Sequence, residues 1–545
     1  MSLLLTLLRA GPITWTRWGD AIAATTDTRP RLVLVGDALD HWSSAMVAAL
    51  NAEVALGAAL AEVFVCVAVD AAAEPVVAAQ LQQALQLSTG ASGLPLIAIC
   101  TPTCEPFGAT PWRRAHDLAH VLLQAAEAWH QRSADCVADA QRIAAAAQVL
   151  RAPAPPSAKP LRATLVLEAA ESAAIEAADT IEGGFGPAPR TAEPALWGLL
   201  VARAARSEAP LSLTKQLEHS LAALAAGAAH DHLAGGFFHG CDDAAWRIPR
   251  CAKRLTDQAH LALLLLDAAA AFSRPLWHEL ALRTLAFAVD SLRLPDGSFA
   301  HGLHADSPAG PGRWEAGAVY RWSTTQVAEV VGNDGARLIA QRFGLPADDH
   351  ESGFLAVGAA LTANEQARVP ALIQRLRIAR DERPQPRRDE SVYPHEQAQM
   401  AYACERAGLS DFAEGLAPHL IGADPWTGRA LVARWHRTGT PEPRALAIAA
   451  GEFDDDVDPA GGLAPTAVLG HLRLDLATLT GDPAWRVRAL ELVERARDRV
   501  RAAPLACAGL LSVLERASAT EVSLPRDNAF GKTGGSRGSG GSKEV

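Results

Sequence analysis

A small residue followed by phenylalanine recurs in the middle third of this 545-residue chain, and its spacing constrains the fold more than any other feature. The pairs lie roughly 50 to 60 residues apart, an interval that holds two helices and their loops. They are Gly184-Phe185, Gly236-Phe237, Ser298-Phe299 and Gly353-Phe354. Residues 161–525 have room for about six such hairpins, and six hairpins can close into an α/α toroid. We therefore expect a closed ring rather than an open solenoid.

The first 115 residues follow a different pattern. Short runs rich in β-branched residues, RLVLV at 31–35, EVFVCVAV at 62–69 and LPLIAIC at 94–100, alternate with helical segments. This alternation predicts an α/β domain over residues 1–115. Residues 116–160 are expected to form a helical connector that ends in a proline-rich linker. The Gly/Ser-rich tail, residues 526–545, is expected to be flexible.

Charge and cysteine usage narrow the function classes. The chain has 50 Lys and Arg against 61 Asp and Glu, a formal net charge of −11, so a nucleic-acid partner is not expected. The 8 cysteines are dispersed and form no C-x-x-C pair, as is usual in a reducing cytosol. The start of the chain reads poorly as a signal peptide, and no apolar run approaches the ~20 residues of a membrane span. A cytoplasmic protein without a membrane partner is the expectation.

Motifs in residues 1–115 resemble the N-terminal thioredoxin-like domain of the spermatogenesis-associated thioredoxin-domain family. They include GPITWTRWGD at 11–20, the Gly-Leu-Pro that ends at Pro95, and the tetrapeptide Asp40-His41-Trp42-Ser43. The resemblance implies a thioredoxin fold with a cis peptide before Pro95. The family carries C-H-W-C at residues 40–43, so both cysteines are replaced here.

This replacement decides the expected chemistry, because neither Asp40 nor Ser43 can form a mixed disulfide. Asp40 is expected to cap the helix that follows it. Residual carboxylate or hydroxyl chemistry by Asp40 or Ser43, with His41 as base, is a weaker alternative because a nucleophilic serine needs its base oriented by a third group. A peptide-binding groove beside Pro95 could persist without redox chemistry.

The remainder of the chain resembles the same family's six-hairpin glycosidase-like toroid. The motifs are GGFG at 183–186, DHLAGGF at 231–237, ADS at 305–307 and DPAG at 458–461. Polar residues are missing from two segments: the family's P-H-F-E-K-M-L-Y-D-N is PRCAKRLTDQ at 249–258, and its T-S-W-N-G-L-M is PHEQAQM at 394–400. The scaffold motifs are therefore better preserved than the polar groups.

In toroids of this type a central cavity gathers carboxylates and histidines that act as acid and base. The candidate catalytic residues are Asp231, Asp257, Asp306, His239 and His304, with Glu315 as a further carboxylate. Each carboxylate could instead cap a helix or hold a loop.

Histidines are unusually frequent in the same loops: His230, His232, His239, His301, His304 and His395. A metal site and an acid–base shuttle are the two functional interpretations. Local hydrogen bonding is the favoured one, so no metal and no cofactor are expected.

The leading hypothesis is a degenerate family member without dithiol activity, which binds a protein or a carbohydrate-like ligand. The alternative is a sugar-modifying enzyme, an epimerase, isomerase or glycoside hydrolase, that acts in the toroid cavity. A thiol oxidoreductase is disfavoured.

Overall fold

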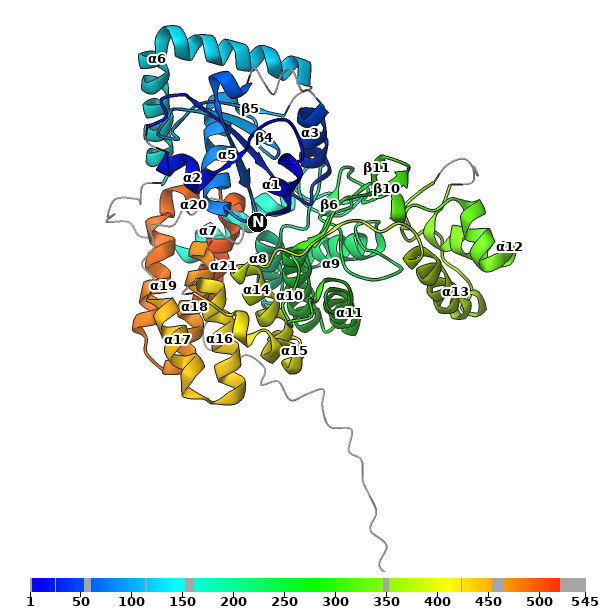
Figure 1. Ribbon diagram of the computed structural model, residues 1–545. Helices are drawn as coiled ribbons and strands as arrows, with labels where there is room; N and C mark the ends of the chain where they lie inside the picture. Colours follow the sequence, from blue (N-terminus) through cyan, green and yellow to red (C-terminus); the bar gives the residue numbers. More distant parts are fainter. Residues whose placement is uncertain are drawn as a thin grey trace, which may run out of the picture.

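The computed structural model describes most of the chain in eight segments (Figure 1). They are residues 2–24, 26–52, 60–112, 115–151, 161–346, 352–422, 424–452 and 465–519. Most of the expected linker, the DPAG motif at 458–461 and the Gly/Ser-rich tail lie outside these segments.

The N-terminal region contains a five-stranded sheet in the order β1-β3-β2-β4-β5. β1, β2 and β3 are parallel, whereas β4 is antiparallel to both β2 and β5. The strands are Thr16–Arg17, Arg31–Gly36, Val65–Asp70, Leu96–Cys100 and Pro106–Pro111. The cis peptide Leu94-Pro95 directly precedes β4. This arrangement confirms the thioredoxin-like fold.

Helices cover both faces of the sheet because alternate strand residues are apolar on both sides. Leu32 and Leu34 of β2 face helices α1, α3 and α6, whereas Val33 and Val35 face α2 and α5. The bounds are Leu3–Leu8 for α1, Trp18–Ala23 for α2, His41–Ala52 for α3, Pro75–Thr89 for α5 and Ala115–Arg151 for α6. Helix α6 is kinked at Arg132 and packs on β5 and α5.

The second region is a closed ring of helical hairpins. Its inner helices are α8 (Pro194–Ala204), α10 (Leu255–Phe272), α14 (Pro394–Arg406), α16 (Pro425–Thr438), α18 (Pro465–Thr480) and α21 (Ala508–Ser518). Each packs on the next, and α21 packs on α8, which closes the ring. The outer helices are α7 (Ala163–Glu176), α9 (Leu211–Ala226), α11 (Pro275–Leu292), α15 (Ser410–Gly415), α17 (Pro441–Gly451) and α19 (Ala484–Arg495). The expected α/α toroid is confirmed.

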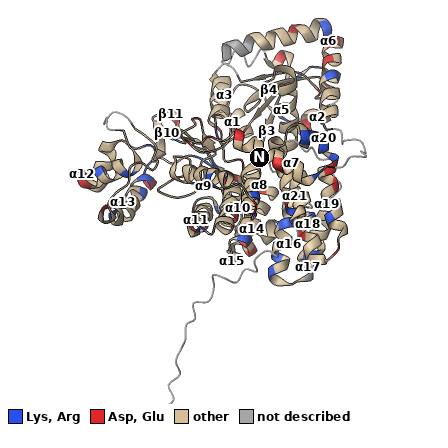
Figure 2. Ribbon diagram, turned by 180° about the vertical axis from the view of Figure 1, so that it is seen from behind, with Lys and Arg blue, Asp and Glu red and all other residues tan. Residues whose placement is uncertain are grey.

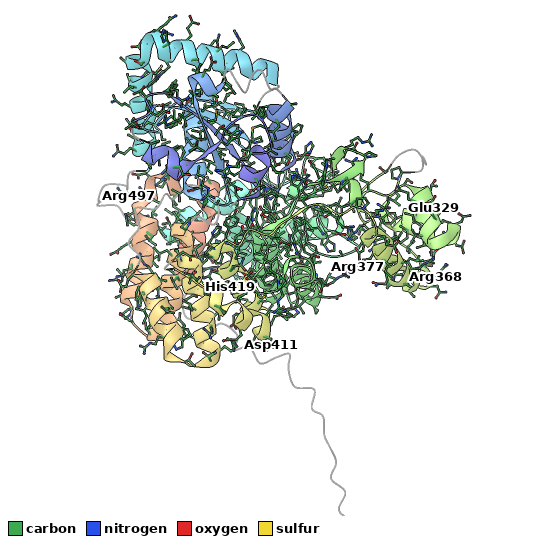
Figure 3. All side chains as sticks on the ribbon, in the orientation of Figure 1. Glu329, Arg368, Arg377, Asp411, His419 and Arg497 are labelled. Carbon is green, nitrogen blue, oxygen red and sulfur yellow. The ribbon has the colours of Figure 1, made fainter. Side chains whose placement is uncertain are left out.

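One hairpin stands outside the ring. Helices α12 (Thr324–Phe343) and α13 (Ala363–Asp381) pack on each other and project to the side in Figure 1. The labelled Glu329 and Arg368 lie on this projection, away from the ring (Figure 3). The expectation that Gly353-Phe354 marks one of the ring repeats is therefore wrong. This pair belongs to the inserted hairpin, which has an apolar core of its own around Val327, Leu338 and Leu376.

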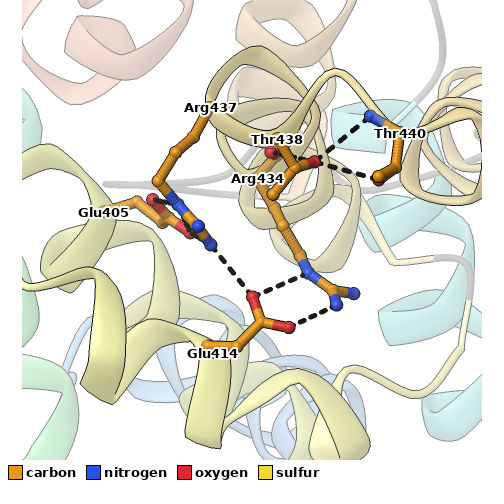
Figure 4. A network of polar contacts seen from close by, with 6 residues as sticks. All are labelled: Glu405, Glu414, Arg434, Arg437, Thr438 and Thr440. Carbon is orange, nitrogen blue, oxygen red and sulfur yellow. Dashed lines mark hydrogen bonds and ion pairs between the residues drawn. The ribbon is translucent and has the colours of Figure 1, made fainter.

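Ion pairs tie neighbouring hairpins of the ring together. Arg434 and Arg437 of α16 bind Glu414 of α15, and Arg437 also binds Glu405 of α14 (Figure 4). Lys and Arg alternate with Asp and Glu along the helices seen from behind (Figure 2), as is typical of a solvated surface. Helix α10 is long and apolar enough to cross a membrane by length and composition, and 56% of it is buried inside the protein.

The thioredoxin-like region sits on one end of the ring, where short strands and loops lead from an outer helix to the next inner helix (Figure 1). The strands here are β6 (Gly240–Cys241), β7 (Pro249–Arg250), β8 (Lys253–Arg254), β9 (Gly302–Leu303), β10 (Asp306–Gly310), β11 (Arg313–Ala316) and β12 (Arg388–Asp389). Leu39, in the loop after β2, joins an apolar cluster with Phe238, Cys251 and Tyr320 of these loops. Its carbonyl accepts the N–H of Ala305 at 2.8 Å. We call this end of the ring the mouth.

Candidate functional site at the mouth of the ring

The loop that ends in the degenerate tetrapeptide is held by local hydrogen bonds. The Asp40 carboxylate accepts the N–H of Ser43 at 2.8 Å, so the expected helix cap is confirmed. The Ser43 hydroxyl is fully buried, accepts the N–H of Asp37 at 3.1 Å and donates to Asp40 at 3.1 Å. The Ser43 hydroxyl is therefore engaged within its own loop and does not reach the surface.

His41 connects the thioredoxin-like domain to the ring. Its Nδ1 lies 2.7 Å from Oδ1 of Asp306, at the start of β10. The hydrogen bond to Asp306 raises the pKa of His41, although partial burial opposes the shift. The side chain stays 37% exposed, so its other ring nitrogen has access to solvent. Asp306, a residue of the ring, therefore orients the imidazole of His41.

His304 makes a second bridge between the domains. Its Nδ1 accepts the N–H of Asp306 at 2.8 Å, so in the neutral ring the proton is on Nε2. This Nε2 donates to the hydroxyl of Ser44 at 2.6 Å. Burial lowers the pKa of His304, consistent with a neutral imidazole. Both ring nitrogens of His304 therefore form structural hydrogen bonds.

A third bridge centres on Arg254. Its guanidinium lies 2.7 Å from Asp37 and donates to Nε2 of His239 at 3.3 Å. Nδ1 of His239 is then the donor to Asp257, at 3.0 Å. Burial raises the pKa of Asp257, but His239 and Arg254 outweigh it and hold the pKa below its usual range. The side chains of His239 and Asp257 are 28% and 22% exposed, so a ligand at the mouth can reach this pair.

A buried pair lies beneath these bridges. Nδ1 of His301 is 2.8 Å from Glu396 of α14, and both side chains are almost inaccessible. Burial lowers the pKa of His301, but Glu396 outweighs burial and raises it to about 9. His301 is thus protonated at neutral pH. His395, one residue before Glu396, stacks on Tyr393.

Asp231 is buried in an ion cluster of its own. Its two oxygens bind Lys253 at 2.6 Å and Arg380 at 2.8 Å, and Oδ1 also accepts the N–H of Leu233 at 3.0 Å. Burial alone would raise the pKa of Asp231, but the two cations hold it well below its usual range. Lys253 also lies 4.1 Å from the Phe287 ring centre. The environment of Asp231 is that of a structural ion cluster, with no free oxygen directed at the mouth.

The sequence-predicted residues therefore fall into four places. His239 and Asp257 pair with each other, and Asp306 and His304 bind the first turn of α3. Asp231 lies apart. Glu315 is 40% exposed and pairs with Arg313 at 3.1 Å. Among the described residues, no group of three or more His, Cys, Asp or Glu has the arrangement of a metal site.

Sequence reasoning missed Arg254, Asp37 and Ser44. Arg254 occupies the position where the family segment quoted above has methionine. A cation in place of an apolar residue could have marked Arg254 as a candidate from the sequence. Asp37 and Ser44 flank the tetrapeptide and carry no signal of their own. Their role depends on partners more than 200 residues away in the chain.

Comparison with known proteins agrees with the thioredoxin-like fold of the N-terminal region. Residues 1–148 match the family Thioredox_DsbH, described as "Protein of unknown function, DUF255". The chain is 28% identical over 338 residues to spermatogenesis-associated protein 20 of Homo sapiens, and 26% identical to that of Rattus norvegicus. Each alignment covers 59% of this chain and 42% of the relative, so the chain matches less than half of the relatives' length. Residues 1–148 thus match the Thioredox_DsbH domain family, and the chain is similar to spermatogenesis-associated protein 20 over 338 residues.

Two solved structures are similar to this chain at low sequence identity. A D-mannose isomerase has a TM-score of 0.37 at 11% identity, over 63% of this chain and 88% of that one. The GH76 α-mannanase BT2949 of Bacteroides thetaiotaomicron has a TM-score of 0.35 at 9% identity, over 66% of this chain and 95% of that one.

Proposed function

We propose that this protein is a redox-silent binding protein whose ligand site is the mouth of the helical ring, covered in part by the thioredoxin-like domain. One observation carries the proposal. The helix start that presents the reactive thiol in a thioredoxin is bound here to the ring by Asp37–Arg254, His41–Asp306 and Ser44–His304.

Thiol chemistry has no support elsewhere in the chain. All 8 cysteines are free and buried. Burial raises the pKa of Cys66 to about 12 and that of Cys404 to about 12, so these thiols stay protonated at neutral pH. The described structure offers no exposed thiolate to start an exchange reaction.

The mouth has the chemistry to hold a polyhydroxylated, carbohydrate-like ligand. His239, Asp257 and the outer face of His41 are partly exposed and supply hydrogen-bonding groups of both kinds. Trp42, on the first turn of α3, is 57% exposed and offers an aromatic face beside them. Large exposed aromatic side chains often mark binding sites.

Titration calorimetry of the full chain against a panel of neutral sugars tests this proposal. We expect one sugar to bind, and His239→Ala and Asp257→Asn to weaken it at least tenfold, or by about 1.4 kcal/mol. His419→Ala, in the short helix after α15 (Figure 3), is the matched control, because His419 takes no part in the three bridges to the thioredoxin-like domain. Failure of the whole panel to bind, or equal binding by the two mouth variants, refutes the proposal.

A sugar-modifying enzyme is the second candidate, and the pairing of histidines with carboxylates favours it. His239–Asp257 and His41–Asp306 each present an imidazole oriented by a carboxylate, an arrangement suited to acid–base catalysis. Turnover of a bound sugar that disappears in both His239→Gln and His41→Gln supports this candidate. Turnover that survives both substitutions rules it out as assigned.

A further inference from the structure

A cavity of about 750 Å³ lies between the two domains, apart from the bridges at Arg254. It is bounded by the first turn of α1, the ends of β1 and β3, and the segment 388–393 that leads into α14. Its polar lining among the described residues includes Ser2, Arg17, Asp70, Glu74, Asp389 and Tyr393. This volume is in the range of small-molecule sites.

Two carboxylates on its wall are buried and only half satisfied. Asp70 is 5% exposed, and its Oδ1 accepts the N–H of Ala72 at 3.1 Å. Asp389 is 3% exposed, and its Oδ1 accepts the N–H and hydroxyl of Ser391 at 3.0 and 2.7 Å. Oδ2 of both residues is buried without a hydrogen-bond partner. Unpaired buried carboxylate oxygens are costly, so native proteins rarely leave two of them at one cavity.

The charges around the cavity are mainly negative. Asp70, Asp389 and Glu74 form no direct ion pair among the described residues, although the protonated His301 acts on Asp70 and Asp389 from a longer distance, whereas Glu390 is paired with Arg388 at 2.6 Å. Arg17, which is exposed, is the remaining cation of the lining. Burial and the neighbouring Asp37 raise the pKa of Asp70 to about 6, against smaller opposing effects of the Ala72 N–H, His301 and the Ser2 hydroxyl, so this carboxyl is mostly ionised at pH 7. The missing partner is therefore a hydrogen-bond donor that carries positive charge.

We propose that this interdomain cavity binds a small organic molecule through a primary ammonium group that donates to Oδ2 of Asp70 and of Asp389. An ammonium group has three donors, and charge-assisted bonds to carboxylates are stronger than neutral ones. A metal ion is not proposed, because the described residues contain no cluster with metal-ligand arrangement. The proposal adds a second site and does not depend on the sugar site at the mouth.

Titration calorimetry of the full chain at pH 7 with glucosamine and with glucose tests the proposal. The two compounds share their ring and differ in one amino group. We expect glucosamine to bind at this site and glucose not to bind there. Asp70→Asn and Asp389→Asn should each weaken glucosamine at least tenfold, because Asn keeps the shape but removes the charge. The matched control is Asp411→Asn, an exposed acid on α15 (Figure 3), which should bind as the native protein does.

Three further results keep the test decisive. The unfolding midpoints of Asp70→Asn and Asp389→Asn should not fall, because each change removes an unpaired buried charge, so lost binding cannot be ascribed to unfolding. In the His239→Ala background, where the proposed sugar site at the mouth is impaired, glucosamine should still bind and Asp70→Asn should still weaken that binding at least tenfold. Equal affinity for glucosamine and glucose, or glucosamine binding that depends on His239 and not on Asp70, overturns the proposal without touching the sugar site.

Discussion

Replacing Asp231 by Asn should destabilise the ring strongly and should do so in a pH-dependent way. The carboxylate is the common counterion of Lys253 at 2.6 Å and Arg380 at 2.8 Å, whose side chains are 1% and 6% exposed. Asn places an N–H donor against the Lys253 ammonium or the Arg380 guanidinium, so two buried cations lose their partner. Breaking a buried ion pair from one side typically costs about 3 to 5 kcal/mol.

The part of this cost that comes from Lys253 has an upper limit, whereas Arg380 stays charged. Burial already lowers the pKa of Lys253 to about 8, even though Asp231 acts to raise it. Without the carboxylate this pKa falls further, which favours the neutral lysine at pH 7. Keeping a lysine with an unfolded pKa near 10.4 neutral at pH 7 costs about 5 kcal/mol. Because its pKa is lowered on folding, the penalty shrinks as pH rises toward the unfolded value.

Chemical denaturation followed by circular dichroism between pH 7 and pH 10 measures this effect. The stability of Asp231→Asn should rise with pH more steeply than that of the native protein, and adding Lys253→Met should recover part of the loss at pH 7. Asp242→Asn is the control, since its pair with Arg250 is exposed and should contribute at most about 1 kcal/mol. An Asp231→Asn protein with native stability and lost ligand binding would show that Asp231 acts at a site rather than in the framework.

Three other changes have defined outcomes. Asp40→Ala should lower the free energy of unfolding by about 1 kcal/mol in denaturant titrations, because the cap of α3 is lost. The His41–Asp306 pair raises the pKa of His41, so its stabilisation is complete below the unfolded histidine pKa of about 6.5 and is lost as pH rises through the folded value. His41→Gln should therefore lower the melting midpoint more at pH 6 than at pH 9. Arg434→Gln, which removes exposed contacts to Glu414, should change stability by about 0.5 kcal/mol.

The parts of the fold that depend on neighbouring residues were predictable from the sequence. The strands, the helix cap at Asp40 and the cis peptide before Pro95 each follow from a short motif or from the resemblance it carries. The ring followed from the spacing of small residue–Phe pairs. The same type of pair at Gly353-Phe354 led to a wrong assignment to the ring, because the inserted hairpin uses the same kind of turn. Only tertiary packing distinguishes this hairpin from those of the ring.

The site was less predictable because its contacts join distant residues. His41 and Asp306 are 265 residues apart, and Arg380 is 149 residues from Asp231. Asp231 and Asp257 are both candidate acids by residue type, yet one is enclosed by two cations and the other faces a histidine at the mouth. A sequence pattern shows which residue types could act in a site. Whether a given carboxylate is structural or available to a ligand depends on its partners in the folded protein.

Restoring the two cysteines tests whether the protein lacks redox activity because its thiols are missing or because a client disulfide cannot reach the start of α3. In Asp40→Cys/Ser43→Cys the redox tetrapeptide is complete, but residue 43 is fully buried and Leu39, His41 and Ser44 remain against the ring. A client disulfide has to reach the helix start, so we expect this variant to reduce insulin at a rate near background. Adding Arg254→Ala and Asp306→Ala should raise the rate by loosening the cover. Rapid insulin reduction by the double-cysteine variant alone would mean that the ring does not block this surface, and the mouth would have to be reconsidered as a client-binding face.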